Sequence, residues 1–422
     1  MDSNIRKRKS AGSKPSFSTT ESRPAPQATS MRTIVLILLP LLSVAGAFGT
    51  LVLIGANGTA DVFKALAKQD NPFLPGSTDH QLRTYTGVAP IDRQLIVLVT
   101  FFSPVLDVQN GALVLFSIFG LGQFGAAWMI MMMEGLRQGN RWKIISFVGT
   151  FGFILQNITF TVTLPIWLFI HLLTSPVAKP PLGSHASSAL LISTLDLKIL
   201  PLTLLLGYIV PSILMALPTP SVTSPIEHQK YIALWQPFPV WCVIIQTLLK
   251  YVIGTVASGN AEKGKHQSTL GASYLNSAKG VYSFITTLCV ITHLPVLLLS
   301  VLPSSVSQNS SPTLQKLAVE SFSSVYLPYF PSLAHKVPSF AAGVHTFLQW
   351  DLYIGSTAML IWGILLNRSA KEAFRGEAGW GGLVVKVVTW LLLAGPCGAL
   401  AVLLWERDAI VNQKTNVGSK KL

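Results

Sequence analysis

Long apolar segments separated by short polar loops dominate the sequence. A membrane-spanning helix needs roughly 20 mostly apolar residues. Eight segments are of about that length, at 33–55, 112–133, 145–173, 198–217, 237–257, 281–302, 344–366 and 383–404. A further apolar segment, 94–106, is shorter and ends in Ser-Pro, which predicts a re-entrant or interfacial helix. The pattern predicts an all-α, polytopic integral-membrane helical bundle of about eight transmembrane helices.

The polar segments lie at the two ends of the chain. Residues 1–30 are basic and then rich in Ser, Thr and Pro, a composition that cannot bury enough apolar surface to fold. We expect a disordered cytosolic tail there, a transmembrane domain over 31–410, and a polar C-terminal tail over 411–422. A cleaved signal peptide is the alternative at the N-terminus. The first apolar segment is longer than a typical signal core, which favours an uncleaved helix.

Composition agrees with a membrane protein. Half of the residues are hydrophobic, 11% are charged and the mean hydropathy is +0.52, whereas about 25% of an average soluble domain is charged. The net charge of +14 would suggest nucleic-acid binding in a soluble protein. Here the basic residues flank apolar segments, so they indicate topology and no nucleic-acid partner is expected. The three cysteines lie in apolar stretches without CxxC spacing, which supports neither a disulfide framework nor a zinc site.

The basic loops conflict with a simple alternation of spans. The N-terminal tail and the loop with Arg137, Arg141 and Lys143 both belong in the cytosol. Strict alternation then puts the basic loops near 263–265 and 368–375 in the lumen, where basic residues are disfavoured. Either a span between about 170 and 235 is miscounted or these loops are exceptions, and the side of the C-terminus stays open. The expected location is the endoplasmic reticulum membrane.

Four Asn-x-Ser/Thr triplets occur, and such a triplet is usable only on a lumenal loop. Asn57 fits the first lumenal loop, which predicts a glycoprotein. Asn157 falls inside a predicted helix. Glycosylation at Asn309 and Asn367 would settle the topology.

Ionisable residues at membrane depth are functional candidates because lipid is a costly place for charge. In the segment 128–141, helical spacing puts Glu134, Arg137 and Arg141 on one face, so Glu134 can pair with either arginine. A plain helix end with snorkelling charges is the alternative. A carboxylate at a helix C-terminus opposes the macrodipole, which singles out Glu134.

Two further segments combine polar and aromatic residues. Spacing of four puts His345, Gln349 and Tyr353 on one stripe of a helix, with Asp351 on a different face. The alternative is an interfacial aromatic belt with Asp351 facing water. In the last span, Pro396 should kink or loosen the helix, and the span ends in Trp405-Glu-Arg-Asp408, which also suits a plain stop signal. We expect Asp196 and Lys198 to pair locally, and His171 to serve packing.

Nucleotide-binding, zinc-protease and hydrolase motifs are absent, as are the DDxxD and DxDD motifs of the soluble terpene cyclases. Against that background, Glu134-Gly-x-Arg137-x-x-Asn140, Gln349-Trp350-Asp351 and Gly395-Pro396 through Trp405-Glu-Arg-Asp408 resemble the fungal membrane-bound terpene cyclases. That family includes the cyclase of the ascofuranone pathway and membrane proteins of indole-diterpene clusters. The resemblance covers about residues 31–410.

The resemblance implies an isomerase that cyclises the epoxidised prenyl chain of a meroterpenoid or indole-diterpene precursor in secondary metabolite biosynthesis. No cofactor and no metal are expected. Opening an epoxide requires a proton donor, for which Glu134 and Asp351 are the candidates, and Asp408 could accept a proton if an ether ring forms. Aromatic faces shield a developing cation. The expected substrate-binding residues are Trp128, Arg137, Gln349, Trp350, Tyr353 and Trp405.

Two other functions are compatible with the same residues. In a transporter the ionisable groups would line a pathway, and in a scaffold they would hold pathway enzymes together. Paired broken helices would favour transport, and an enclosed apolar pocket with opposed carboxyls would favour cyclisation. The expected partners are an apolar prenylated small molecule, the lipid bilayer and other enzymes of the same pathway.

Overall fold

The computed structural model describes residues 26–179, 185–258, 267–302, 309–376 and 379–418. These residues form helices joined by loops, with one isolated bridge between Phe73 and His80 and no β-strand among them. The predicted all-α fold class is confirmed. Most of the N-terminal tail and the basic residues 263–265 lie outside the described residues.

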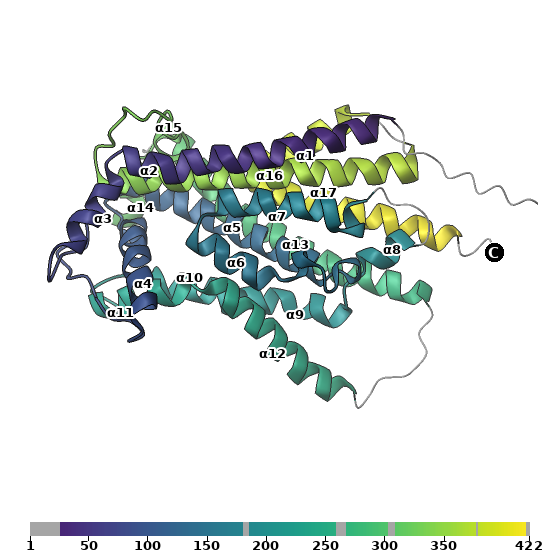
Figure 1. The fold of residues 1–422 in the computed structure, drawn as a ribbon, viewed down its shortest axis with the longest axis horizontal. Coiled ribbons are helices and arrows are strands. Elements are labelled where there is room, and N and C mark those ends of the chain that lie inside the picture. The colour runs from purple at the N-terminus through teal and green to yellow at the C-terminus, as the bar shows by residue number, and fades with distance from the viewer. Residues whose placement is uncertain (1–25, 180–184, 259–266, 303–308, 377–378, 419–422) are drawn as a thin grey trace, which may run out of the picture.

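Long helices run along the long axis of the molecule (Figure 1). Seven helical segments of the described chain are long and apolar enough to cross a membrane, so the chain is a membrane protein. They include Ala89–Leu106 but not the long helix over Phe340–Arg375. Two of the long helices contain a π-helical turn. The bundle consists of α1 (Pro26–Ala47) with η1 (Phe48–Val52) and α2 (Leu53–Ala56), α5 (Gly111–Leu136), α9 (Thr194–Leu204) with η6 (Leu205–Ile209) and α10 (Val210–Met215), α12 (Phe238–Ser258), α13 (Gln267–Val301), α16 (Phe340–Arg375) and α17 (Gly381–Gly418).

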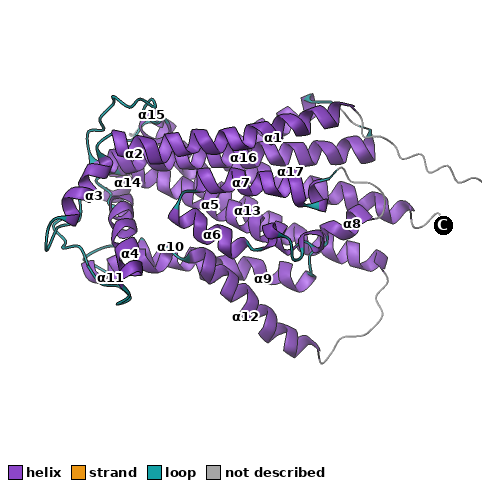
Figure 2. Cartoon of the chain, viewed as in Figure 1, coloured by secondary structure: helices purple, strands orange, loops and turns teal. Residues whose placement is uncertain are grey.

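Short elements and most loops gather at the two ends of the bundle (Figure 2). One end carries α3 (Thr59–Ala67), α4 (Ala89–Phe102) with η2 (Ser103–Leu106), α11 (Pro225–Trp235), α14 (Pro312–Leu317) and α15 (Phe322–Tyr326). The other end carries η3 (Gln138–Asn140), η4 (Ile144–Ser146), η5 (Pro176–Ala178) and α8 (His185–Leu190). Helix α4 runs across the bundle axis rather than along it (Figure 1), as an interfacial or re-entrant helix does.

The segment expected to form one span at 145–173 is instead a hairpin of two helices, α6 (Val148–Asn157) and α7 (Phe160–Thr174). The chain reverses around Thr159, whose side chain accepts the Val162 amide and so caps α7. The Phe160 ring packs on the Phe124 ring at 4.9 Å, about halfway along α5. Arg32, at the start of α1, donates to the carbonyl of Leu172 near the end of α7. The hairpin thus penetrates about half of the bundle and returns.

Helix α17 also folds back on itself. Gly395 has φ 70° and ψ −177°, which only glycine adopts without strain. Lys386 Nζ lies 2.7 Å from Glu406 Oε1, although a straight helix would separate residues 20 positions apart by about 30 Å. The two halves are therefore antiparallel. The interruption predicted at Pro396 is confirmed, and it reverses the chain direction.

Gln123, halfway along α5, bridges this reversal. Its Nε2 donates to the Ala394 carbonyl at 3.0 Å, and its Oε1 accepts the Cys397 amide at 2.9 Å. A backbone break inside a membrane leaves polar groups without partners unless the protein supplies them. One side chain thus stabilises both sides of the break.

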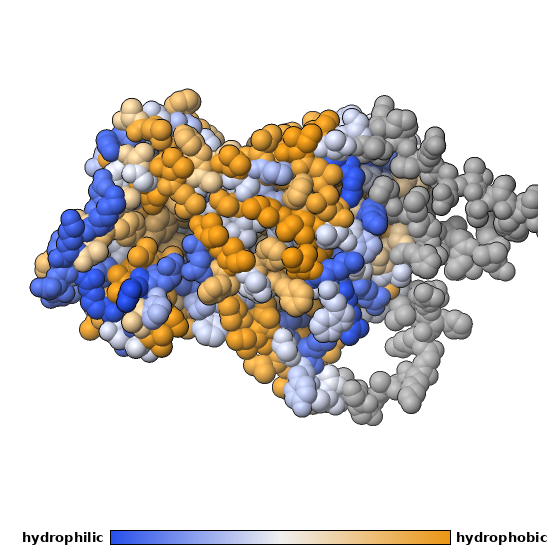
Figure 3. Space-filling model, in the orientation of Figure 1, coloured by the Kyte–Doolittle hydropathy of each residue, from blue (hydrophilic) through white to orange (hydrophobic). Residues whose placement is uncertain are grey.

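The two hairpins change the order in which the chain crosses the bundle. Each enters and leaves at the same end, so the start of α1, the end of α12, the start of α13, the end of α16 and the end of α17 all share one end (Figure 1). The expected miscount between about 170 and 235 is wrong, because the segment that does not cross is 145–173. Without that crossing, the basic segments 137–143 and 368–375 fall at the same end of the bundle, and the hairpin of α17 returns the end of that helix to it. The outer faces of the long helices are apolar (Figure 3), with Val44 68% exposed.

Candidate functional site

Near the end of α5, four charged side chains form one buried network. Glu134, Arg137, Arg407 and Asp408 are each at most 3% exposed. They come from α5, the turn after it and the second half of α17. Two carboxylates and two guanidiniums cancel in charge, which makes burial of all four groups feasible.

Glu134 is held by cations on one side and by a histidine on the other. Its Oε1 lies 2.8 Å from Arg137 Nε and 3.1 Å from Arg407 Nη2. Its Oε2 lies 3.3 Å from His171 Nε2. The Trp362 indole donates to His171 Nδ1 at 3.2 Å, so a neutral imidazole carries its hydrogen on Nε2, facing Glu134.

Asp408 accepts bonds from four side chains. Arg137 Nη2 lies 3.0 Å from Oδ2, and Arg407 Nη2 lies 2.8 Å from Oδ1. The hydroxyls of Tyr274 and Tyr282, both on α13, donate to Oδ2 at 2.5 and 2.9 Å. The network therefore ties α5, α7, α13, α16 and α17 together at one end of the bundle.

The motif spacing at the end of α5 is explained by this network. Asn140 Nδ2 donates to the Glu134 carbonyl at 2.7 Å, which satisfies the helix C-terminus, and Ser175 donates to Asn140 Oδ1. The predicted pairing of Glu134 with Arg137 is confirmed. The alternative partner, Arg141, instead lies over the Trp142 ring at 5.8 Å.

Sequence reasoning missed three members of the network. His171 was expected to serve packing only, and neither tyrosine was singled out. The eight-residue spacing of Tyr274 and Tyr282 puts them on one stripe of a helix, and this was the available signal.

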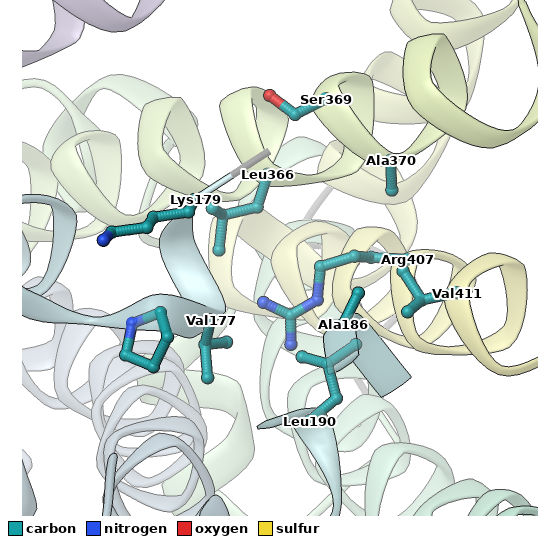
Figure 4. A pocket seen from close by; sticks show the side chains of 10 residues that line it. Val177, Lys179, Ala186, Leu190, Leu366, Ser369, Ala370, Arg407 and Val411 are labelled. Atoms are coloured by element: carbon teal, nitrogen blue, oxygen red, sulfur yellow. The ribbon is translucent and has the colours of Figure 1, made fainter. Parts of the chain in front are cut away.

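A small cleft opens beside Arg407. It has room for about 20 Å³, close to the volume that one water needs. The guanidinium points into it between Val177, Leu366 and Leu190 (Figure 4), and Nη1 has no hydrogen-bond partner among the described residues. The cleft is too small for a prenylated substrate.

Asp351 has a different environment. Its Oδ1 accepts the amide of Thr161, the second residue of α7, at 2.9 Å. The positive end of the α7 dipole thus faces this half-buried carboxyl at the middle of the bundle. Across the described chain, no Lys, Arg or His nitrogen lies within 4.0 Å of it. A Cβ at Gly46 on α1 would lie 2.3 Å from the Thr161 hydroxyl, so glycine is needed for this close approach.

Trp350 lies next to Asp351 and faces α1. A Cβ at Gly49 would lie 3.2 Å from the Trp350 side chain. The indole Nε1 is buried and has no hydrogen-bond partner in the part of the chain that is described. Outside this contact lies an apolar groove of about 430 Å³ between α1 and α16.

The remaining predicted residues lie elsewhere. The stripe on α16 is confirmed: His345 Nε2 and Gln349 Nε2 both lie about 3 Å from the Val325 carbonyl, and the Tyr353 hydroxyl donates to the Tyr326 carbonyl at 2.6 Å. These side chains hold α15. Trp128 packs on the Phe238 ring at 5.7 Å within the core, and Trp405 packs partly buried against the same core.

Apart from Trp128 and Trp405 in the core, the predicted residues form three groups rather than one pocket. Glu134, Arg137 and Asp408 share the ionic network, Trp350 and Asp351 lie near the start of α7, and Gln349 and Tyr353 contact α15. No cluster of three or more His, Cys, Asp or Glu side chains suited to a metal occurs among the described residues.

Several known proteins are similar to this chain in sequence, and most of those found are named terpene cyclases. Terpene cyclase ascI of Acremonium egyptiacum is 29% identical over 86% of this chain and 89% of its own length. Terpene cyclase atmA of Aspergillus flavus is 27% identical over 79% of this chain and 86% of its own length. FAD-dependent monooxygenase anuJ of Penicillium roqueforti is 26% identical over 72% of this chain, which corresponds to 33% of that protein.

No solved structure matches this chain. The family model of the CtvD domain matches residues 34–412, which includes all the groups described above. The chain belongs to the CtvD-domain family.

Proposed function

We propose that this protein is a membrane-bound terpene cyclase that opens the epoxide of a prenylated precursor by proton transfer. The support is the Asp351 carboxyl of α16, which faces the start of α7 and lies next to an apolar groove. It has no cationic partner among the described residues. It occurs in a family whose relatives include proteins named terpene cyclases. Asp351 is our candidate for the proton donor.

The reaction balances without another reactant. The protonated Asp351 carboxyl gives its proton to the epoxide oxygen as the carbon–oxygen bond breaks. An alkene or a hydroxyl of the same molecule then attacks the electron-poor carbon, which closes a carbocycle or an ether ring. The proton lost by the cyclised cation returns to the Asp351 carboxylate, which restores the donor, so the product is an isomer of the substrate. Aromatic faces such as that of Trp350 stabilise the positive charge.

One relative supports an epoxide as the substrate. A protein named an FAD-dependent monooxygenase contains a segment similar to this chain. A monooxygenase adds one oxygen atom to its substrate, which is the step that turns an alkene into an epoxide. We propose that the substrate is a meroterpenoid or indole-diterpene precursor made by such a step.

The roles of Glu134 and Asp408 follow from their partners. Both carboxylates face two guanidiniums, which stabilise their charged forms. We propose that they fix the ends of the helices rather than exchange protons with substrate. The endoplasmic reticulum membrane is the proposed location, with both ends of the chain cytosolic because the basic loops share the end of the bundle where α1 begins.

A panel of substrates tests the proposal. Microsomes containing the protein should convert an epoxidised prenyl-phenol or an epoxidised indole-diterpene precursor into an isomer of equal mass. Turnover should persist after treatment with EDTA. Failure to convert any such epoxide would overturn the cyclase proposal, and loss of turnover in EDTA would overturn its metal independence.

Transport is the second candidate, favoured by the two hairpins whose tips lie at the middle of the bundle. Transporters commonly bind substrate at such helix breaks. In sealed vesicles a transporter would accumulate the prenylated compound unchanged, whereas a cyclase would yield the isomer with no dependence on an intact vesicle. The family relationship favours the cyclase.

A further inference from the structure

We propose that the groove between α1 and α16 is the site that holds the isoprenoid chain of the substrate, entered directly from the bilayer. This inference rests on the proposed function and assigns a place to the substrate's apolar part. The groove is lined by Leu41, Val44, Ala45, Phe48, Gly49, Pro331, Trp350 and Ile354.

Size and lining suit an isoprenoid chain. Its volume of about 430 Å³ lies within the range of roughly 300–1,000 Å³ typical of small-molecule sites. Every lining side chain is apolar apart from the Trp350 indole N–H. Phe48 and Trp350 supply aromatic faces, which attract a carbocation as well as an alkene. Since Val44 is 68% exposed on the outer surface of α1, a chain dissolved in the bilayer can reach the groove without passing through water.

The groove adjoins the candidate proton donor. Ile354 and Asp351 are three residues apart on α16 and lie about 60° apart around the helix. Gly46, near the end of α1, approaches Thr161, the partner of Asp351, and Gly49, in the following turn η1, approaches Trp350. The junction of α1 with η1 therefore borders both the groove and the start of α7.

One buried polar group in the lining of the groove has no partner and points to a ligand with an oxygen atom. The Trp350 Nε1 hydrogen lacks a hydrogen-bond partner among the described residues. A buried donor without a partner costs free energy, so such groups are usually satisfied by a ligand or a water. The π-helical turn η1 begins at Phe48, and π-helical turns inside α-helices are frequent at functional sites.

The experiment uses a farnesyl-phenol carrying a diazirine on its chain, which has no epoxide and so reports binding alone. The full-length protein is labelled in phosphatidylcholine nanodiscs, with and without excess unlabelled farnesyl-phenol. Labels should fall on the peptides that contain residues 41–49 and 350–354, and the competitor should remove them. Val44→Trp, which fills the groove, should lower labelling and raise KM for an epoxidised substrate about tenfold or more, with a smaller change in kcat.

Val385→Trp is the matched control. Val385 lies on α17 and is 66% exposed, close to the 68% of Val44, but it does not line the groove. This variant should keep labelling and KM. Labelling elsewhere would overturn the inference, and so would an unchanged KM in Val44→Trp. Labelling that excess farnesyl-phenol does not remove would also overturn it, because lipid chains would then occupy the groove.

The two proposals can fail separately. Groove labelling without turnover of any epoxide would leave the binding site standing and overturn the cyclase. Turnover with labelling at another place would support the cyclase and overturn the groove.

Discussion

The roles of individual carboxyls are set by their neighbours rather than by depth in the membrane. Glu134 and Asp408 lie against guanidiniums within 3.1 Å, whereas Asp351 faces a backbone amide. A proton donor must be able to hold a proton, and an adjacent guanidinium opposes this. Of the two candidate donors from the sequence, Glu134 lies against guanidiniums and Asp351 does not, which is why we propose Asp351 as the donor.

Removing one partner of the ionic network should destabilise the protein. Glu134→Gln leaves two guanidiniums with one carboxylate, and breaking a buried pair typically costs about 3–5 kcal/mol. We expect a large loss of folded protein in detergent, measured by thermal unfolding. The control is Asp61→Asn, which breaks the exposed Lys64–Asp61 pair and should cost under about 1 kcal/mol. Equal stability of the two variants would contradict the role given to Glu134.

Pairs within one helix turn were predictable from sequence, and distant pairs were not. Glu134 and Arg137 are three residues apart, so helical spacing identifies them. The expected local pair of Asp196 with Lys198 is wrong, because residues two apart point to different faces. Asp196 instead pairs with Lys250 at 2.6 Å on another helix. Only the packing of α9 against α12 brings these two residues together.

Helix interruptions account for most of the difference between the expected and observed elements. Hydropathy detects apolar segments but not the direction of the chain within them. Residues on both sides of Thr159 and Gly395 are apolar, so each hairpin resembles one long span. Gly395-Pro396 gave a signal for a break. A reversal could not be inferred, because it depends on Gln123 of α5 bonding both sides of the break.

The reversal at Gly395 should tolerate no side chain. A Cβ there would lie 2.8 Å from the Gln123 amide, at a φ and ψ that cost other residues roughly 1–3 kcal/mol. Gly395→Ala should therefore lower the unfolding temperature and the yield of monodisperse protein. Gly280→Ala, in α13 with open space around it, should be neutral or stabilising by up to about 1 kcal/mol. A Gly395→Ala protein as stable as Gly280→Ala would disprove this account of the turn.

For the whole molecule, the fold class and membrane location follow from composition and hydropathy, while the topology depends on the hairpins. Because α6 and α7 form a hairpin, the basic segment that follows α5 and the basic end of α16 share the end of the bundle where α1 begins. The basic segments 137–143 and 368–375 then no longer conflict with the alternation of spans, although α3, α4 and α11 at the other end also carry basic residues. The four Asn-x-Ser/Thr triplets lie in different surroundings. Asn57 and Asn367 are buried, Asn157 is exposed at the end of α6, where the hairpin turns within the bundle, and Asn309 is exposed outside the long helices.

Glycosylation should therefore occur at Asn309. It follows α13 at the end opposite to the start of α1, whereas the buried Asn367 donates to the Leu403 carbonyl. An endoglycosidase-sensitive gel shift should vanish in Asn309→Gln and persist in Asn367→Gln. A shift lost only in Asn367→Gln would contradict the proposed topology.

The central claim is that Asp351 gives the proton that opens the epoxide, and Asp351→Asn tests it directly. The amide oxygen can still accept the Thr161 N–H, so the variant should fold, which thermal unfolding in detergent will verify. With an epoxidised prenyl substrate that the wild type converts, we predict that kcat falls at least about 100-fold, the lower range for loss of a general acid. Wild-type turnover by the folded Asp351→Asn protein would contradict the account.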